Sequence, residues 1–301
     1  ATRTLESRKD RVMTMLIIPF MSCSARLPVY VLLISAFFPH NQGLVLFSIY
    51  LIGILIAVLS SVLFKKLLFA KQEAPFVMEL PPYRIPTVHN VVRHMWDKGA
   101  QYLKKMGTVI LLASIIIWAL GHYPRNVEYS TDYAAEKALV AASDQSAEEK
   151  QAQIQHLDNC QYAEHQEKSY IGRIGHFIEP AIRPLGFDWR IGVSLASGLA
   201  AKEVIVSTMA VLNNSGDDET MLARNLQKQT YASGPKAGEH VYTPLVAYTL
   251  MIFILLYFPC IATVAAIGSE AGWRWAVASV AYNTLLAWLA AWAVYHLVMW
   301  L

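Results

Sequence analysis

Long apolar runs recur along this chain, and polar segments separate them. A helix rises 1.5 Å per residue, so about 20 apolar residues cross the hydrocarbon core of a bilayer. Six runs approach or exceed that length, namely 12–38, 44–64, 106–123, 191–212, 244–268 and 276–301. The pattern therefore predicts an all-α, polytopic membrane protein with about six spanning helices.

The polar segments divide the predicted protein into parts. Residues 130–168 are rich in Ala, Glu and Gln, which indicates a helical region outside the membrane. A basic stretch at 89–105 fits either a helix lying in the membrane interface or a solvated loop. The expected parts are 1–64 with spans one and two, 65–105 as a cytoplasmic segment, 106–123 as span three, 124–189 as an extracytoplasmic loop, 190–212 as span four, 213–243 as a cytoplasmic loop, and 244–301 with spans five and six.

Lys and Arg residues set the expected orientation, because they gather in cytoplasmic loops. Segments 1–11, 65–105 and 213–243 hold 4, 8 and 3 of the 25 Lys and Arg residues, whereas 39–43 holds none. Both ends of the chain are therefore expected in the cytoplasm. The chain starts at Ala and stops inside an apolar run, so we expect it to be a piece of a longer protein.

Composition narrows the class further. Hydrophobic residues make up 55% of the chain and charged residues 16%, against about 25% charged in an average soluble domain. A net charge of +3 without a basic block argues against nucleic acid as a partner and leaves the lipid bilayer. Three scattered cysteines do not form a disulfide framework, and no phosphate-binding or nucleophile-elbow motif occurs.

Two of the predicted spans contain prolines beside a cysteine and hydroxyl residues. Proline frees a backbone carbonyl, which in lipid must meet water, a side chain or an ion. Paired interrupted helices are typical of transport sites, although a proline can also merely kink a helix. The predicted metal pathway consists of Ser22, Cys23, Ser24, Cys260 and Thr263, with Pro19, Pro28 and Pro259 as the helix breakers.

The side chains of this predicted pathway favour particular ions. Thiol ligands together with oxygens suit borderline ions such as Fe²⁺ or Mn²⁺ better than Mg²⁺ or Ca²⁺. Glu203 in span four is expected to compensate the ion's charge, because an ionised side chain inside the membrane is costly unless it is paired or hydrated. Its neighbour Lys202 faces another direction on a helix and receives no assigned role.

Several stretches, in order along the chain, resemble one family. They are 19–30 (Pro-Phe-Met-Ser-Cys-Ser-Ala-Arg-Leu-Pro-Val-Tyr), 76–84 (Phe-Val-Met-Glu-Leu-Pro-Pro-Tyr-Arg), 180–189, 201–208 (Ala-Lys-Glu-Val-Ile-Val-Ser-Thr) and 258–263 (Phe-Pro-Cys-Ile-Ala-Thr). Together they resemble the membrane region of the bacterial ferrous iron transport protein B (FeoB) family. Residues 122–168 show no recognisable family pattern.

The resemblance implies an inner-membrane importer whose transported substrate is Fe²⁺, with two gate motifs centred on Cys23 and Cys260. It also implies an N-terminal G-protein domain that binds GTP and Mg²⁺, which this sequence does not contain. No residue of this chain is therefore assigned to GTP. A small cytoplasmic Feo protein is an implied partner, and the sequence leaves open whether the protein forms a homo-oligomer.

Two alternatives stay open beside transport. The first is a membrane-embedded thiol enzyme in which Cys23 or Cys260 is a redox or acyl-carrying nucleophile. Such a thiol needs a base, and no histidine lies near either cysteine in sequence. The second is a scaffold subunit, in which Glu203 would have no role. Transport ranks first, so we expect a transporter and not an enzyme.

Overall fold

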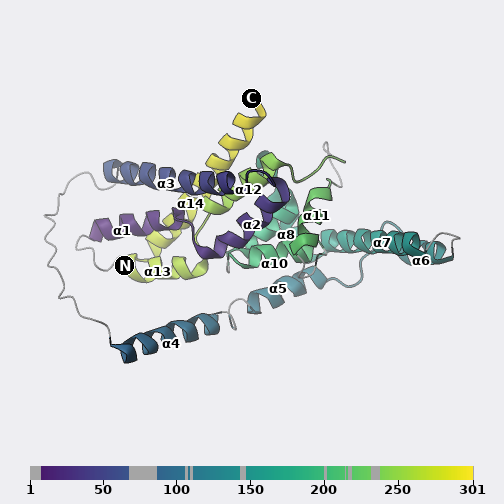
Figure 1. Ribbon diagram of the computed structural model, residues 1–301, viewed down its shortest axis with the longest axis horizontal. Helices are drawn as coiled ribbons and strands as arrows, with labels where there is room; N and C mark the ends of the chain where they lie inside the picture. Colours follow the sequence, from purple (N-terminus) through teal and green to yellow (C-terminus); the bar gives the residue numbers. More distant parts are fainter. Residues whose placement is uncertain are drawn as a thin grey trace.

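The computed structural model describes residues 8–67, 87–105, 108, 111–142, 147–199, 202–213, 215, 219–231 and 238–300 (Figure 1). The all-α prediction is confirmed, since the β pairing within these ranges is one isolated bridge between Thr230 and His240. The α-helices are α1 (Arg8–Ile17), α2 (Leu27–Phe37), α3 (Gln42–Leu67), α4 (Val88–Lys105), α5 (Leu111–His122), α6 (Tyr133–Ala142), α7 (Ala147–Lys168), α8 (Tyr170–Ile182), α9 (Trp189–Ser197), α10 (Val204–Leu212), α11 (Glu219–Lys228), α12 (Pro244–Leu256), α13 (Ile261–Ala271) and α14 (Trp273–Trp300). Short 3-10 turns occur at η2 (Ile18–Phe20), η3 (Ser24–Arg26) and η5 (Arg183–Leu185).

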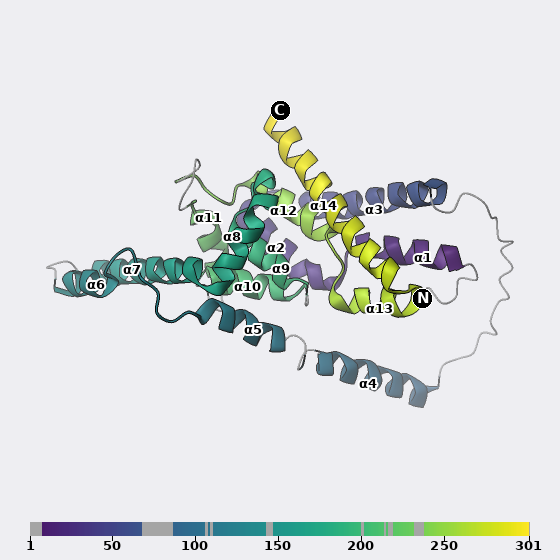
Figure 2. The ribbon, with the colours of Figure 1, turned by 180° about the vertical axis from the view of Figure 1, so that it is seen from behind.

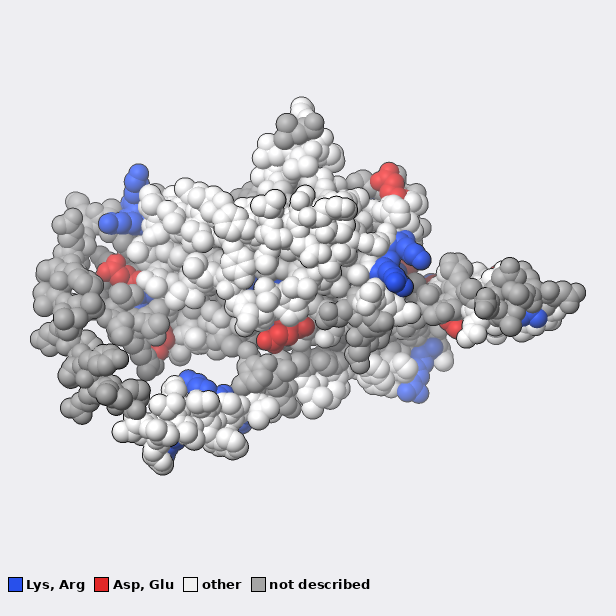
Figure 3. All heavy atoms as spheres, in the orientation of Figure 1, with Lys and Arg blue, Asp and Glu red and all other residues white. Residues whose placement is uncertain are grey.

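Three helical segments are long and apolar enough to cross a membrane: Asp10–Phe37, Gln42–Lys66 and Trp273–Trp300. They match the first, second and sixth predicted spans. Large apolar side chains on α3 point outward, with Phe47 and Leu59 exposed at 65% and 68%. Outward apolar side chains are expected where lipid is the solvent. In Figure 3 charged side chains are sparse over the broad middle of the face shown.

The helical body has two distinguishable ends. A cluster that includes Val12, Phe64, Ile267 and Ala276 joins the beginnings of α1 and α14 to the ends of α3 and α13, and we call it the near end. The far end lies where α2 meets α11 and the segment around Leu185. In Figures 1 and 2, α1 and α13 lie at one end of the body and α8 and α11 at the other.

The fourth predicted span is not one continuous helix but folds back on itself. Helix α9 ends at Ser197 and α10 begins at Val204. The Thr208 hydroxyl donates to the Ser197 hydroxyl at 2.9 Å, and Trp189 packs with Leu212 in one buried cluster. The two halves are therefore antiparallel and form a re-entrant hairpin that enters and leaves from the far end.

The described residues of 213–243 lie at the same end as 39–43, although the sequence predicts the two segments on opposite sides. The Gln227 amide donates to the carbonyl of Ala36 at the end of α2. Tyr242 stacks on Phe37 with ring centroids 6.1 Å apart. The described part of this segment therefore shares the far end with 39–43, and its cytoplasmic placement stays a prediction.

Helix α14 connects the two ends of the helical body. Helix α14 starts in the near-end cluster, and its Trp288 indole donates to the Ala181 carbonyl at 2.8 Å. It therefore runs from the near end, where α1 also begins, to the far end. Of the Lys and Arg residues, three lie in 8–11, two in 65–67 and one in 268–275, described segments at or beside the near end.

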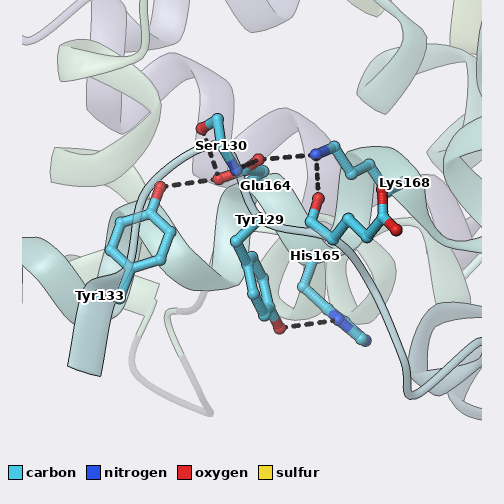
Figure 4. A network of polar contacts seen from close by, with 7 residues as sticks. Tyr129, Ser130, Tyr133, Glu164, His165 and Lys168 are labelled. Carbon is cyan, nitrogen blue, oxygen red and sulfur yellow. Dashed lines mark hydrogen bonds and ion pairs between the residues drawn. The ribbon is translucent and has the colours of Figure 1, made fainter. Parts of the chain in front are cut away.

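The predicted helical loop is present beyond the far end as the α6–α7 pair (Figures 1 and 2). Glu164 on α7 holds the preceding loop, because its carboxylate accepts from the Ser130 backbone at 2.7 Å and from Tyr133 at 2.9 Å (Figure 4). Lys168 adds an ion pair to Glu164 at 2.8 Å. Partial burial alone would raise the pKa of Glu164, but hydrogen bonds from Lys168, Ser130 and Tyr133 outweigh it and lower that pKa to about 2.

Candidate functional site

The first predicted break lies where the prolines indicated. Helix α1 stops at Ile17, and two 3-10 turns lead to α2 at Leu27. Arg26 is 3% exposed and fills this break. Its guanidinium donates to the Pro19 carbonyl at 2.9 Å and to the Met21 carbonyl at 3.3 Å. The sequence predicts an ion at this break, and in the structure a side chain of the protein binds two of its backbone carbonyls.

Pro28 does not break a helix. It stands in the first turn of α2, where a missing backbone N–H costs nothing. The carbonyl one turn earlier, on Ser24, accepts the backbone N–H of Leu27. The expectation that Pro28 releases a carbonyl for the ion is therefore wrong.

The second break also lies where predicted, between α12 and α13. Helix α12 ends at Leu256, and Cys260 is the N-cap residue of α13. The Cys260 sulfur lies 3.4 Å from the Thr263 hydroxyl. Thus two of the predicted pathway residues share the first turn of α13.

The tip of the α9–α10 hairpin meets this second break. The backbone N–H of Ile261 donates to the Leu199 carbonyl at 3.1 Å. The Lys202 ammonium donates to the Phe258 carbonyl at 3.1 Å and lies 3.2 Å from the centroid of the Tyr257 ring. The hairpin is therefore fastened to the broken helix through backbone and side-chain contacts.

The first break joins the same region. The thiols of Cys23 and Cys260 and the guanidinium of Arg26 are all within electrostatic range of the Lys202 ammonium. The Tyr257 hydroxyl is likewise in range of Tyr30 and of both thiols. The fold thus brings two gate motifs, more than 230 positions apart in sequence, around one buried lysine.

The remaining predicted residues differ in exposure. Cys23 and Ser24 are exposed, Thr263 and Cys260 are half-buried, and none of the cysteines forms a disulfide. The Ser22 hydroxyl is buried without a hydrogen-bond partner in the described part of the chain. Pro259 is buried between Phe258 and Cys260. Within the described ranges, no group of three His, Cys, Asp or Glu residues is arranged to hold a metal.

Glu203 and Lys202 differ in burial. Glu203 is half-exposed at the start of α10 and makes no capping hydrogen bond. Lys202, which received no role, is buried at the contact between two breaks. Sequence reasoning also missed Tyr257 and underused Arg26. The sequence did contain a signal for Arg26 and Lys202, because a basic residue inside an apolar run is costly to bury without a partner.

Comparison with known proteins identifies the family. The family model described as "Ferrous iron transport protein B C terminus" matches residues 46–98. The Gate model, described as "Nucleoside recognition", matches residues 103–274, a range that contains the hairpin and the second break. No solved structure matches the chain.

Curated relatives match almost the whole chain. An "Fe(2+) transport protein A/Fe(2+) transporter FeoB fusion protein" of Porphyromonas gingivalis is 50% identical over 99% of this chain, which covers 35% of that protein. An "Fe(2+) transporter FeoB" of Methanocaldococcus jannaschii is 35% identical over 97% of this chain and 38% of its own length. That of Helicobacter pylori is 37% identical over 97% of this chain and 44% of its own length. The chain therefore spans well under half of the relatives it matches.

These matches and the broken helices place the chain in the class of helical membrane proteins that match the Gate model. Within that class the resemblance seen in the sequence is confirmed. The chain belongs to the ferrous iron transport protein B (FeoB) family.

Proposed function

We propose that this chain is the membrane part of a transporter that carries Fe²⁺ across the bacterial inner membrane into the cytoplasm. The observation that carries the proposal is that the thiols of Cys23 and Cys260, from two broken helices, both lie within electrostatic range of Lys202. The relatives are named as Fe(2+) transporters, which supports the same cargo and favours transport over a thiol enzyme.

The pathway uses the chemistry of the two breaks. Thiols suit Fe²⁺ better than they suit Mg²⁺ or Ca²⁺, and hydroxyl oxygens complete a mixed ligand set. The residues are Cys23, Ser22 and Ser24 from the first break and Cys260 and Thr263 from the second. Glu203, half-exposed beside the hairpin tip, attracts the cation toward them.

Orientation follows from the basic near end. Lys and Arg gather in the cytoplasmic segments of membrane proteins. We therefore place the near end in the cytoplasm and the α6–α7 pair outside it. Fe²⁺ then enters through the far end, where the hairpin α9–α10 begins and ends.

The rest of the transporter lies in other parts of the protein or in partners. A G-protein domain that binds GTP and Mg²⁺ would bias the gates, since a ligand shifts an equilibrium only through differential affinity. A small Feo protein is a further proposed partner. The P. gingivalis relative supports it, because its printed name joins transport protein A to FeoB in one chain.

Radioactive iron uptake by cells that depend on this protein for Fe²⁺ tests the proposal. We expect Cys23→Ser and Cys260→Ser each to lower uptake strongly at normal membrane abundance, and Glu203→Gln to lower it less. Cys160→Ser on α7 is the matched control and should transport normally. Full uptake by both gate-cysteine variants would remove the thiols from the pathway.

Glu203→Gln also separates transport from the scaffold alternative. A scaffold requires no charge at this position, so normal uptake by Glu203→Gln would favour it. Glu239→Gln, at an exposed far-end residue, controls for loss of a carboxylate elsewhere.

A further inference from the structure

Lys202 is the one buried lysine of the described residues, with 3% exposure. An ammonium at membrane depth is costly unless it is paired or hydrated. Among the described residues, no ion pair joins Lys202 to a carboxylate. A carboxylate partner therefore does not explain why Lys202 is buried, and other groups must stabilise its charge.

The groups around Lys202 are those that bind a cation. A backbone carbonyl, that of Phe258, accepts from its ammonium at 3.1 Å. The ring face of Tyr257 lies 3.2 Å away, as in the recognition of ammonium ions by aromatic rings. The thiols of Cys23 and Cys260 are within electrostatic range. The ammonium thus occupies the place that a transported cation would take.

Arg26 occupies the first break in a similar way. Its guanidinium binds the carbonyls of Pro19 and Met21, so both breaks hold a positive charge that belongs to the protein. Arg26 and Lys202 also act on each other electrostatically. A divalent cation at the two thiols would meet repulsion from both charges, and one of them has to move.

Lys202 is the charge whose movement would open the protein. Arg26 contacts carbonyls only five and seven positions away in its own chain segment, so its release would leave the helices where they are. Lys202 instead joins the hairpin tip to the second break, 56 positions further along the chain. Its release would remove the side-chain contact between two structural elements and leave the backbone hydrogen bond from Ile261 to Leu199.

We propose that Lys202 is a tethered cation that closes the second break, and that the transported divalent cation must displace it. This inference rests on the proposed function. Displacement frees the Phe258 carbonyl and the ring face of Tyr257 and lets the hairpin tip move away from α13. The cation thereby opens the pathway by replacing a charge that the protein itself supplies.

Thiol labelling tests the closing role without any metal. In membrane vesicles that contain the intact protein, the labelling rate of Cys260 by N-ethylmaleimide is followed by peptide mass spectrometry. We expect Lys202→Met, which keeps a long stem without the charge, to label several-fold faster than the wild type. Lys228→Met on α11 is the matched control and should label at the wild-type rate.

An unchanged labelling rate in membrane-inserted Lys202→Met would overturn the proposal. If that variant does not insert, Tyr257→Leu removes the ring face and keeps the lysine. We expect it also to label several-fold faster, and an unchanged rate would likewise overturn the closing role.

Uptake of Fe²⁺ by the same vesicles tests displacement. Without a competing ammonium, Lys202→Met should reach half-maximal uptake at a several-fold lower Fe²⁺ concentration than the wild type. An unchanged or higher concentration would refute displacement. Absence of uptake in the wild type would refute the proposed function instead, and the labelling result would still decide whether Lys202 closes the break.

Discussion

The hydroxyl of Tyr257 lies over the backbone of Gly198, so close that a β-carbon at Gly198 would stand 2.1 Å from it. Only glycine lets the hairpin tip approach the second break at this distance. The same tyrosine presents its ring to Lys202. Because Gly198 has no side chain, the hairpin tip lies close to Tyr257, and Lys202 therefore contacts the Tyr257 ring.

The first prediction concerns this close approach. Gly198→Ala should force the tip away from Tyr257 and lower stability by about 1–3 kcal/mol, the usual cost of overpacking. Thermal unfolding in detergent measures the loss. Tyr257→Phe in the same chain should restore part of it, because the clashing hydroxyl is gone.

Gly43→Ala on α3 is the control, since a β-carbon there meets no atom within 4 Å. It should unfold at or slightly above the wild-type temperature. Equal unfolding temperatures for Gly198→Ala and the wild type would contradict the close packing at the tip.

The second prediction concerns the guanidinium in the first break. Arg26→Leu leaves the carbonyls of Pro19 and Met21 without their donor, and a buried unsatisfied group such as the Pro19 carbonyl costs about 1–3 kcal/mol. We expect a clear fall in the unfolding temperature, with a smaller fall for Arg26→Lys because one donor group remains. The exposed Arg224 on α11 supplies the control variant Arg224→Leu, and a fall no larger than that of this control would contradict the bracing role.

The third prediction concerns pH at the contact between α7 and the loop before α6. The pKa of Glu164 falls from 4.5 to about 2 on folding. A lowered carboxyl pKa stabilises the folded state above the unfolded pKa, and that contribution is lost as the pH falls through the folded value. The contribution should therefore be complete above about pH 5 and should disappear between there and pH 2.

Amide hydrogen exchange at Ser130, compared between the wild type and Glu164→Gln, measures this contribution. The wild type should be better protected near neutral pH, and the two proteins should converge in acid. Glu136→Gln on α6 serves as the control with wild-type protection. If the difference in Ser130 protection between the wild type and Glu164→Gln stays constant down to pH 2, ionisation of Glu164 is not the source of that protection.

The fourth prediction concerns the side on which α11 lies. Single cysteines at Asn41→Cys and Lys228→Cys, with the three native cysteines replaced by serine, should react with a membrane-impermeant maleimide from the same side. A cysteine at Lys65→Cys, at the near end of α3, should react from the other side. Labelling of Lys228→Cys together with Lys65→Cys would restore the original placement of 213–243.

Much of the fold follows from local sequence. Helix formation and hydropathy depend on neighbours within a few turns, so the long apolar runs that became α3 and α14 were visible as spans. The breaks at Pro19 and Pro259 were visible for the same reason, because proline lacks a backbone donor wherever it stands. The helical character of 130–168 and the family membership also needed nothing beyond the sequence.

Only the tertiary structure decided how these segments meet. An apolar run such as 191–212 has the length of a span whether it crosses or turns back, and the contact between Ser197 and Thr208 that makes it a hairpin is not encoded in hydropathy. Lys202 has a partner only because this hairpin packs against the second break. There its ammonium donates to the carbonyl of Phe258, 56 positions further along the sequence.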